Sequence, residues 1–166
     1  MESVYFAKKQ KKIHISHMNH LEIIPVYDET LFTDKKNTDK PILKIGNFER
    51  KVMTLVHQTD WSEENEDFIK KILSAGNLQI NDYLIMVIQN QSQLFEVINQ
   101  HKPEILFLFG LNLDHEFFKS NKSMYKPFIL NDIKIALCDG LNQVKTDKEK
   151  RLLLWNQCIK PIFNIQ

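Results

Sequence analysis

The sequence predicts an α/β protein in which helices cover both faces of a mainly parallel sheet. Four short runs are rich in aliphatic, β-branched and aromatic residues, as buried strands are: Lys51–His57, Tyr83–Ile88, Glu104–Gly110 and Asp132–Cys138. The segments between the first three runs repeat their apolar residues with the period of a helix. Strands that alternate with helices form parallel βαβ units, so we expect a three-layer α/β/α domain with a four-stranded, mainly parallel sheet.

The two helices between these strands have recognisable ends. Ser62 is a favourable N-cap residue, and the two glutamates after it suit the positive end of a helix dipole. Gly76 is a typical residue just past the end of a helix. Ser92 begins the second predicted helix, and Pro103 stops it because proline cannot continue a helix.

A final helix follows the fourth strand and has an unusually wide apolar surface. Thr146 and Glu149 match a capping box at its start. One helical stripe contains Leu152, Trp155, Ile159 and Ile162, and it is widened by Leu153, Leu154 and Cys158. A helix of this kind either lies between two layers or presents Trp155 to a partner, and both interpretations stay open.

Three parts are expected along the chain. They are a flexible basic arm (1–20), an irregular lead-in with a possible edge strand at Pro41–Gly46 (21–50) and the α/β/α domain (51–166). The arm carries Val4, Tyr5 and Phe6 ahead of four lysines, a composition typical of segments that order only on a partner.

Composition excludes several classes of protein. At 166 residues the chain is long enough for a buried core, and its net charge of +1 provides no global attraction for nucleic acid. Only 4 glycines are present, which disfavours glycine-rich phosphate-binding loops, and we find none of the phosphate-binding motifs. There is no apolar run near the roughly 18 residues of a membrane span and no export signal, so we expect a cytoplasmic protein.

We expect no metal and no cofactor. His14, His17 and His20 stand at three-residue intervals in the arm, but a metal site needs a rigid helix and a further ligand, and a solvated arm explains them better. The cysteines, Cys138 and Cys158, have neither metal nor redox spacing.

Polar residues follow the predicted strands, where ligand sites in open parallel sheets lie. Asp60 beside His57 is a candidate general base with an orienting partner, although Asp60 also suits the start of the next helix. Asp114 and His115 form a second candidate pair, equally well explained by a solvated loop. We therefore predict no catalytic residue.

A basic and aromatic stretch lies between the third and fourth strands. Its lysines and aromatic residues alternate in a way that suits stacking on single-stranded nucleic acid: Phe117, Phe118, Lys119, Lys122, Tyr125 and Lys126. A surface loop whose aromatic side chains turn inward is the interpretation that we favour.

The order of segments resembles the psi subunit of bacterial DNA polymerase III over roughly residues 50–160. The match is strongest at Leu106–Leu111, which is similar to that family's apolar strand ending in glycine, and at Arg151–Gln157, which is similar to its helix with a basic start, leucines and a tryptophan. Leu141 and Val144 stand where the family's linker presents apolar residues.

This resemblance implies a fold and a role. The fold would be that of the uracil-DNA glycosylases, with parallel strands in the order 2-1-3-4, but without their activity. The role would be an accessory subunit of the clamp loader. Its N-terminal segment, here Met1–His20, would bind the clamp-loader ATPase. Its globular domain would bind a chi-like subunit that contacts single-stranded-DNA-binding protein, so that DNA is reached only indirectly.

The same fold supplies a rival hypothesis, a glycosylase-like enzyme or nucleobase-binding domain that acts at the strand ends. By resemblance, Asp60 would stand near the water-activating acid and Asn90 near the residue that reads uracil. The loop Cys138–Asn142, however, lacks the histidine that would stabilise the uracil oxygen, a contribution typically worth several kcal/mol of barrier. We therefore expect a non-enzyme. A stand-alone receiver-like or ligand-binding domain is a third possibility.

Partner contacts are expected at apolar residues of the arm, the loop after the third strand and the last helix. They are Val4, Tyr5, Phe6, Leu111, Leu113, Phe117, Phe118, Leu141, Val144 and Trp155. Tryptophan is the favoured interface anchor among them because one side chain removes a large apolar area from water.

Overall fold

The computed structural model describes residues 43–111 and 123–165, all within the unit Asn37–Gln166. The predicted arm, residues 1–20, and most of the predicted lead-in lie outside the described residues. The strands are β1 (Leu43–Ile45), β2 (Val52–His57), β3 (Tyr83–Ile88), β4 (Ile105–Phe109), β5 (Phe128–Leu130) and β6 (Ile133–Cys138). The helices are α1 (Glu63–Ala75), α2 (Gln91–His101), α4 (Leu141–Thr146), α5 (Lys148–Leu153) and α6 (Lys160–Phe163), with a 3-10 helix η1 (Gln58–Asp60) and a π-helix η2 (Leu154–Ile159).

The protein is α/β, and its sheet is mixed. Six strands lie in the order β1-β3-β2-β4-β6-β5. The inner four are parallel, whereas β1 pairs antiparallel with β3 and β5 pairs antiparallel with β6. The predicted edge strand in the lead-in therefore exists as β1. The prediction of a four-stranded sheet was wrong, because the edge strands β1 and β5 make the sheet six-stranded.

Strand β5 was missed because it has only three residues, too few to show a period. It is joined to β6 by Asn131 and Asp132, which have φ values of 47° and 64°. Two consecutive residues with positive φ suit the tight turn of a hairpin, and asparagine and aspartate tolerate this conformation better than most residues do. The turn carried a signal, but the short run before it did not.

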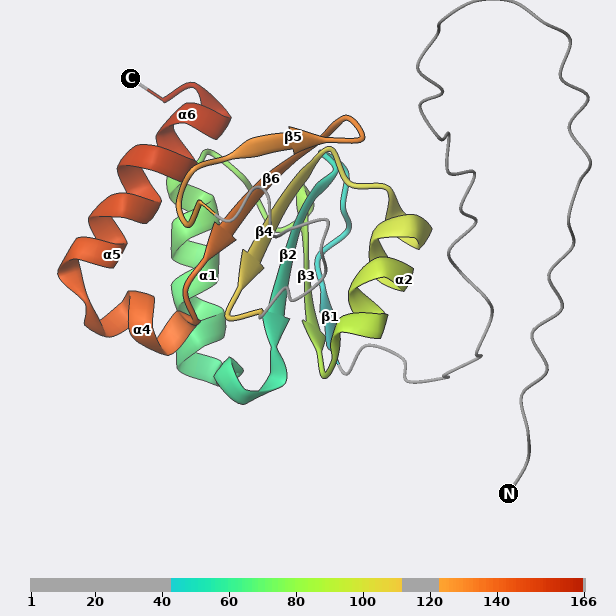
Figure 1. The fold of residues 1–166 in the computed structure, drawn as a ribbon, viewed down its shortest axis with the longest axis horizontal. Helices are drawn as coiled ribbons and strands as arrows, with labels where there is room; N and C mark the ends of the chain where they lie inside the picture. The colour runs from blue at the N-terminus through green and yellow to red at the C-terminus, as the bar shows by residue number, and fades with distance from the viewer. Residues whose placement is uncertain (1–42, 112–122, 166) are drawn as a thin grey trace, which may run out of the picture. The chain divides into compact units, whose positions relative to one another are not determined.

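Strand side chains alternate between two apolar cores. Val52 and Phe107 belong to the core shared with α1 and the C-terminal helices, while Met53 and Leu108 belong to the core shared with α2. Figure 1 shows α1 with α4, α5 and α6 on one face of the sheet and α2 on the other. Every strand of the central four is buried on both faces, which explains the near-continuous apolar runs in the sequence.

Helix α1 begins and ends as predicted. The Ser62 hydroxyl accepts a hydrogen bond from the Asn65 backbone N–H at 3.2 Å, and Gly76 follows the last residue of the helix. The N-cap of helix α2 lies two residues earlier than expected. Asn90, not Ser92, is its N-cap, and its side-chain oxygen accepts from the Gln93 N–H at 3.2 Å. Asparagine and serine are comparable caps, so the sequence alone did not separate them.

The predicted capping box at Thr146 and Glu149 is wrong. Asp147 caps α5, accepting hydrogen bonds from the N–H groups of Glu149 at 2.8 Å and Lys150 at 3.2 Å. The Thr146 hydroxyl instead donates to the Asn142 carbonyl at 2.8 Å, inside the preceding helix α4. The residues just before α5 are therefore helical as well, as α4.

The C-terminal segment buries a different set of side chains from the predicted stripe and contains the π-helix η2. A π-helix has more residues per turn than an α-helix, so it rotates all later side chains relative to an α-helical projection. Leu154, Cys158, Ile159 and Ile162 are buried, whereas Leu152 is 50% exposed and Leu153 is 37% exposed. Leu152 and Leu153 precede η2 and lie on the exposed side of α5, so the buried apolar face begins at Leu154 and not at Leu152.

Candidate functional site

The carboxyl ends of the central strands bring Asp60 against two glycines. Asp60 ends η1 directly after β2, while Gly110 follows β4 and Gly140 follows β6. A Cβ atom at Gly110, which has a φ of +66°, would lie 2.5 Å from Oδ2 of Asp60. A Cβ at Gly140 would overlap the same oxygen. The carboxylate therefore packs closely against backbone that only glycine can provide here.

A chain of hydrogen bonds holds the other oxygen of this carboxylate. Nδ2 of Asn142 donates to Oδ1 of Asp60 at 3.0 Å, and Nδ2 of Asn65 donates to Oδ1 of Asn142 at 2.8 Å. The same Asn65 nitrogen donates to the Asp60 carbonyl oxygen at 2.6 Å. We call Asp60, Asn65 and Asn142 the strand-end network. It ties the segment after β2 to α1 and α4, across 82 positions of sequence between Asp60 and Asn142.

His57 is engaged elsewhere. The Thr59 backbone N–H points to Nδ1 of His57 at 3.4 Å and can only donate, so Nδ1 is the acceptor. The proton then resides on Nε2, which donates to the Gln89 carbonyl at 3.0 Å. Nδ1 thus bonds Thr59 and Nε2 bonds Gln89, so the predicted partnership of His57 with Asp60 as an orienting group is not formed.

Tyr125 and Lys150 meet at Asp139, just after β6. The Tyr125 hydroxyl donates to Oδ2 of Asp139 at 2.8 Å, and Nζ of Lys150 lies 3.2 Å from the same oxygen. Burial raises the pKa of the Tyr125 phenol, and the neighbouring Asp139 carboxylate raises it further. Tyr125 therefore stays protonated as a hydrogen-bond donor, and its aromatic ring turns inward as expected for a surface loop.

Asn90, the residue placed near a uracil-reading position by resemblance, also serves its own helix. Its side-chain oxygen accepts from the Gln93 N–H and from the Ser92 hydroxyl at 2.6 Å. The polar groups that follow the strands thus bond to neighbouring parts of the fold. In the described part of the chain, no cluster of three or more potential metal-ligating side chains is present.

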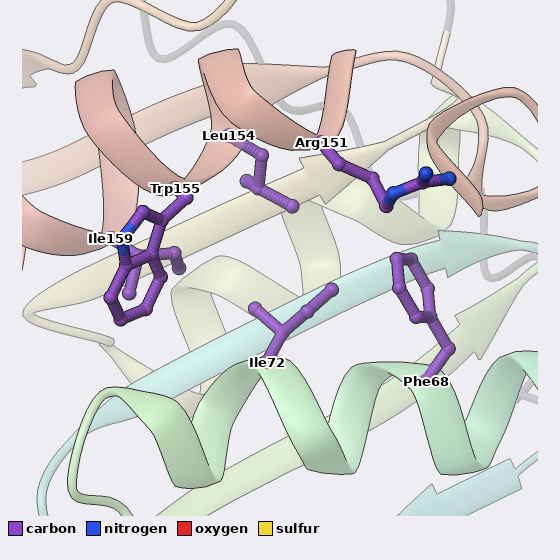
Figure 2. A pocket seen from close by; sticks show the side chains of 6 residues that line it. All are labelled: Phe68, Ile72, Arg151, Leu154, Trp155 and Ile159. Atoms are coloured by element: carbon purple, nitrogen blue, oxygen red, sulfur yellow. The ribbon is translucent and has the colours of Figure 1, made fainter. Parts of the chain in front are cut away.

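A second region, on the helix side of the sheet, is lined mainly by apolar side chains. Side chains from α1 and from the C-terminal helices line a cavity of about 100 Å³. The lining residues, which we call the helix-face groove, are Phe68, Ile72, Arg151, Leu154, Trp155 and Ile159. In Figure 2 the two α1 side chains point toward the four from the C-terminal segment, with Arg151 near the Phe68 end and Trp155 near Ile159.

Three of the groove residues, Leu154, Trp155 and Ile159, belong to the π-helix η2. With Arg151 they stand at positions i, i+3, i+4 and i+8, which share one face of a helix, and this face lies toward α1. π-Helical turns are rare and occur frequently at functional sites. Next to this groove, a more polar hollow of about 280 Å³ is lined by Phe68 together with charged residues of α1 and α4.

The structure brings only some of the predicted contact residues to the surface. Trp155 is half-buried and lines the groove. Leu141 and Val144 are fully buried in the core beneath α4, so these two side chains present no surface to a partner and the expectation for them is corrected. Leu111 is half-buried against the α2 core. The remaining predicted residues, Val4, Tyr5, Phe6, Leu113, Phe117 and Phe118, lie outside the described residues, as do Asp114, His115 and the three histidines of the arm.

Sequence reasoning missed Phe68, Ile72 and Arg151 as groove residues. A signal existed in α1, where Phe68 and Ile72 flank the buried Ile69 and Leu73 and make the apolar face wider than burial against the sheet requires. Arg151 carried no signal, because its place beside Phe68 depends on how the C-terminal segment crosses α1.

Comparison with known proteins adds no identification. No protein-family model matches the chain, and no curated protein sequence matches it significantly. Among the residues that the structure describes, no helix combines the length and apolar character that crossing a bilayer requires.

Proposed function

We propose that this protein is a non-catalytic adaptor, a psi-like accessory subunit of the replicative DNA polymerase III clamp loader. It would connect the clamp-loader ATPase to a chi-like subunit through protein–protein contacts and reach DNA only indirectly. A cytoplasmic location belongs to the same proposal.

One observation carries the adaptor role. The polar groups at the strand ends are engaged with the fold itself, with His57 bonded at both nitrogens and Asp60 held by Asn142 and packed between glycines. A general base must reach the proton that it removes. The ring nitrogens of His57 would have to give up their present partners first, and Oδ2 of Asp60 lies close against Gly110 and Gly140. The helix face, in contrast, leaves apolar side chains open to solvent.

The arrangement of the sheet supports the psi-like identity. The four parallel strands stand next to one another as β3-β2-β4-β6, which in chain order among themselves is 2-1-3-4. This is the order expected of the uracil-DNA-glycosylase-like fold that the resemblance implies. The match at Arg151–Gln157 also coincides with the segment that forms the helix-face groove.

The proposal is tested by recovery on immobilised clamp-loader ATPase. Full-length protein should be retained, and a variant lacking residues 1–20 should be lost while it still binds the chi-like subunit. Equal recovery of both forms would remove the arm from the proposal, and recovery of neither partner by full-length protein would end the adaptor role.

The enzyme hypothesis has its own test, because Asp60 does stand at the end of the first parallel strand. Release of uracil from single-stranded DNA should not exceed the blank with the wild-type protein. Release that is present in the wild type and absent in Asp60→Asn would replace the adaptor by a glycosylase.

A further inference from the structure

The helix-face groove has the size of one aliphatic side chain. Its volume of about 100 Å³ is smaller than the roughly 150 Å³ of an enclosed cavity that holds benzene, and it suits an aliphatic side chain such as leucine or isoleucine. Five of the six lining side chains are apolar. In the same C-terminal segment, Leu152 and Leu153 follow Arg151 in the chain and are exposed.

The only charged side chain among the six that line the groove is a cation. Nη1 of Arg151 donates to the Lys145 carbonyl, which uses one of the five N–H groups of the guanidinium. Arg151 is exposed, and it has no carboxylate partner among the described residues. A guanidinium matches a carboxylate in a two-pronged geometry that a lysine does not offer.

Charges nearby do not cancel this preference. Lys145 forms an ion pair with Glu64, so the two neutralise each other in the adjoining hollow. Lys71 and Asp67 line that hollow together and are of opposite sign. The unmatched charge at the groove is therefore that of Arg151.

From this we propose that the helix-face groove binds an acidic amphipathic helix of a partner protein, with an aliphatic side chain in the cavity and a carboxylate at Arg151. A groove between two helices receives a third helix through apolar anchors spaced three and four residues apart. The proposal rests on the adaptor function and states the chemistry of the partner segment that the globular domain would recognise.

Two synthetic helical peptides test it with the full-length protein. Both are about 18 residues long, so that they can form a stable helix, and share leucines at i, i+3, i+4 and i+7; one has glutamates beside the leucines and the other has lysines. Fluorescence anisotropy of the labelled peptide measures binding. The acidic peptide should bind about tenfold or more tightly than the basic one, because charge complementarity decides between otherwise equal partners.

Variants assign the binding to the groove. Arg151→Glu should weaken the acidic peptide about tenfold or more and improve the basic one. Ile72→Trp, which fills the cavity without adding charge, should weaken both. Arg50→Glu is the matched control, since Arg50 is also an exposed arginine bonded to one backbone carbonyl but does not line the groove, and it should change neither affinity.

The alternatives have distinct outcomes. Equal affinity for the two peptides, no binding of either, or binding that survives both Arg151→Glu and Ile72→Trp would overturn the proposal. A dimer in sedimentation of the protein alone that Arg151→Glu dissociates would assign the groove to a second copy and overturn it as well. None of these results affects recovery by the clamp-loader ATPase, so the adaptor function is judged separately.

Discussion

The strand-end network and the helix-face groove lie on one domain but differ in what they leave available. In the network, Asn65 is only 1% exposed, and its amide nitrogen bonds both the Asp60 carbonyl and Asn142. In the groove, a cavity remains open between α1 and η2, and the neighbouring Leu152 is half exposed. Polar residues at a strand end are the usual place to look for chemistry. Here they bond to one another and to neighbouring backbone, whereas the helix-face groove leaves apolar side chains open to solvent.

The largest expected effect separates two neighbouring leucines of the C-terminal segment. Leu154→Ala should lower the free energy of unfolding by about 2–5 kcal/mol, because Leu154 is buried in the core below η2. Leu152→Ala should cost less than about 1 kcal/mol, because its side chain is half exposed. Urea denaturation measures both. The reverse order would contradict the burial of Leu154 and the exposure of Leu152 in this structure.

The next effect concerns the network. Asn65→Leu, which is similar in size, should lower the free energy of unfolding by about 2–3 kcal/mol, since the Asp60 carbonyl and the Asn142 side chain each lose a buried hydrogen-bond donor. The matched control is Asn99→Leu, an exposed asparagine within α2, which should change stability by about 0.5 kcal/mol at most. Equal effects of the two substitutions would mean that the network contributes little.

The raised pKa of Tyr125 should make the free energy of unfolding fall in alkali. Burial raises its pKa in the folded protein above the ordinary value of 10.0, so the unfolded chain releases this proton first as the pH rises. The stabilisation of the folded protein that results from this raised pKa is therefore complete below pH 10.0. Above that pH it declines by up to about 1.4 kcal/mol per pH unit for one proton. Tyr125→Phe should flatten the decline of unfolding free energy above this pH. An unchanged slope would exclude Tyr125 as its source.

The smallest effect lies at the edge of the helix face. Lys145 donates a hydrogen bond to Glu64 and lowers the pKa of that carboxyl. The ion pair therefore stabilises the folded protein fully above the ordinary pKa of 4.5, and this stabilisation is lost as the pH falls through the lowered pKa. Both side chains are accessible to solvent, so the contribution should be slight and should disappear in high salt. The measurement is the salt dependence of the melting temperature between pH 7 and pH 4. Glu64→Gln should remove the part of this dependence that the ion pair causes. A salt dependence that is unchanged in the variant would have another origin.

The parts of the fold that the sequence predicts are those with local signals. The apolar runs of β2, β3, β4 and β6 and the caps at Ser62 and Gly76 each depend on a few neighbouring residues. Strand β5 gave no such signal because it is three residues long. The π-helix was not foreseen because the sequence of η2 is equally compatible with an α-helix.

The candidate sites were harder to predict because they depend on distant residues. Asp60 was singled out, but its partner Asn142 is 82 positions away and no local pattern links the two. Trp155 was recognised as an anchor from its type, whereas Arg151 and Ile72 became groove residues only when α1 and α5 met. The burial of Leu141 and Val144 likewise follows from α4 lying against α1.

The chain's two tryptophans report on the two regions separately. Trp61 follows η1 at the strand ends, and Trp155 lines the helix-face groove. Their indole N–H signals in a nitrogen–proton NMR spectrum, assigned with Trp61→Phe and Trp155→Phe, can be followed while the chi-like subunit is added. We predict that the Trp155 signal shifts and the Trp61 signal does not. A shift confined to Trp61 would place binding at the strand ends and contradict the account.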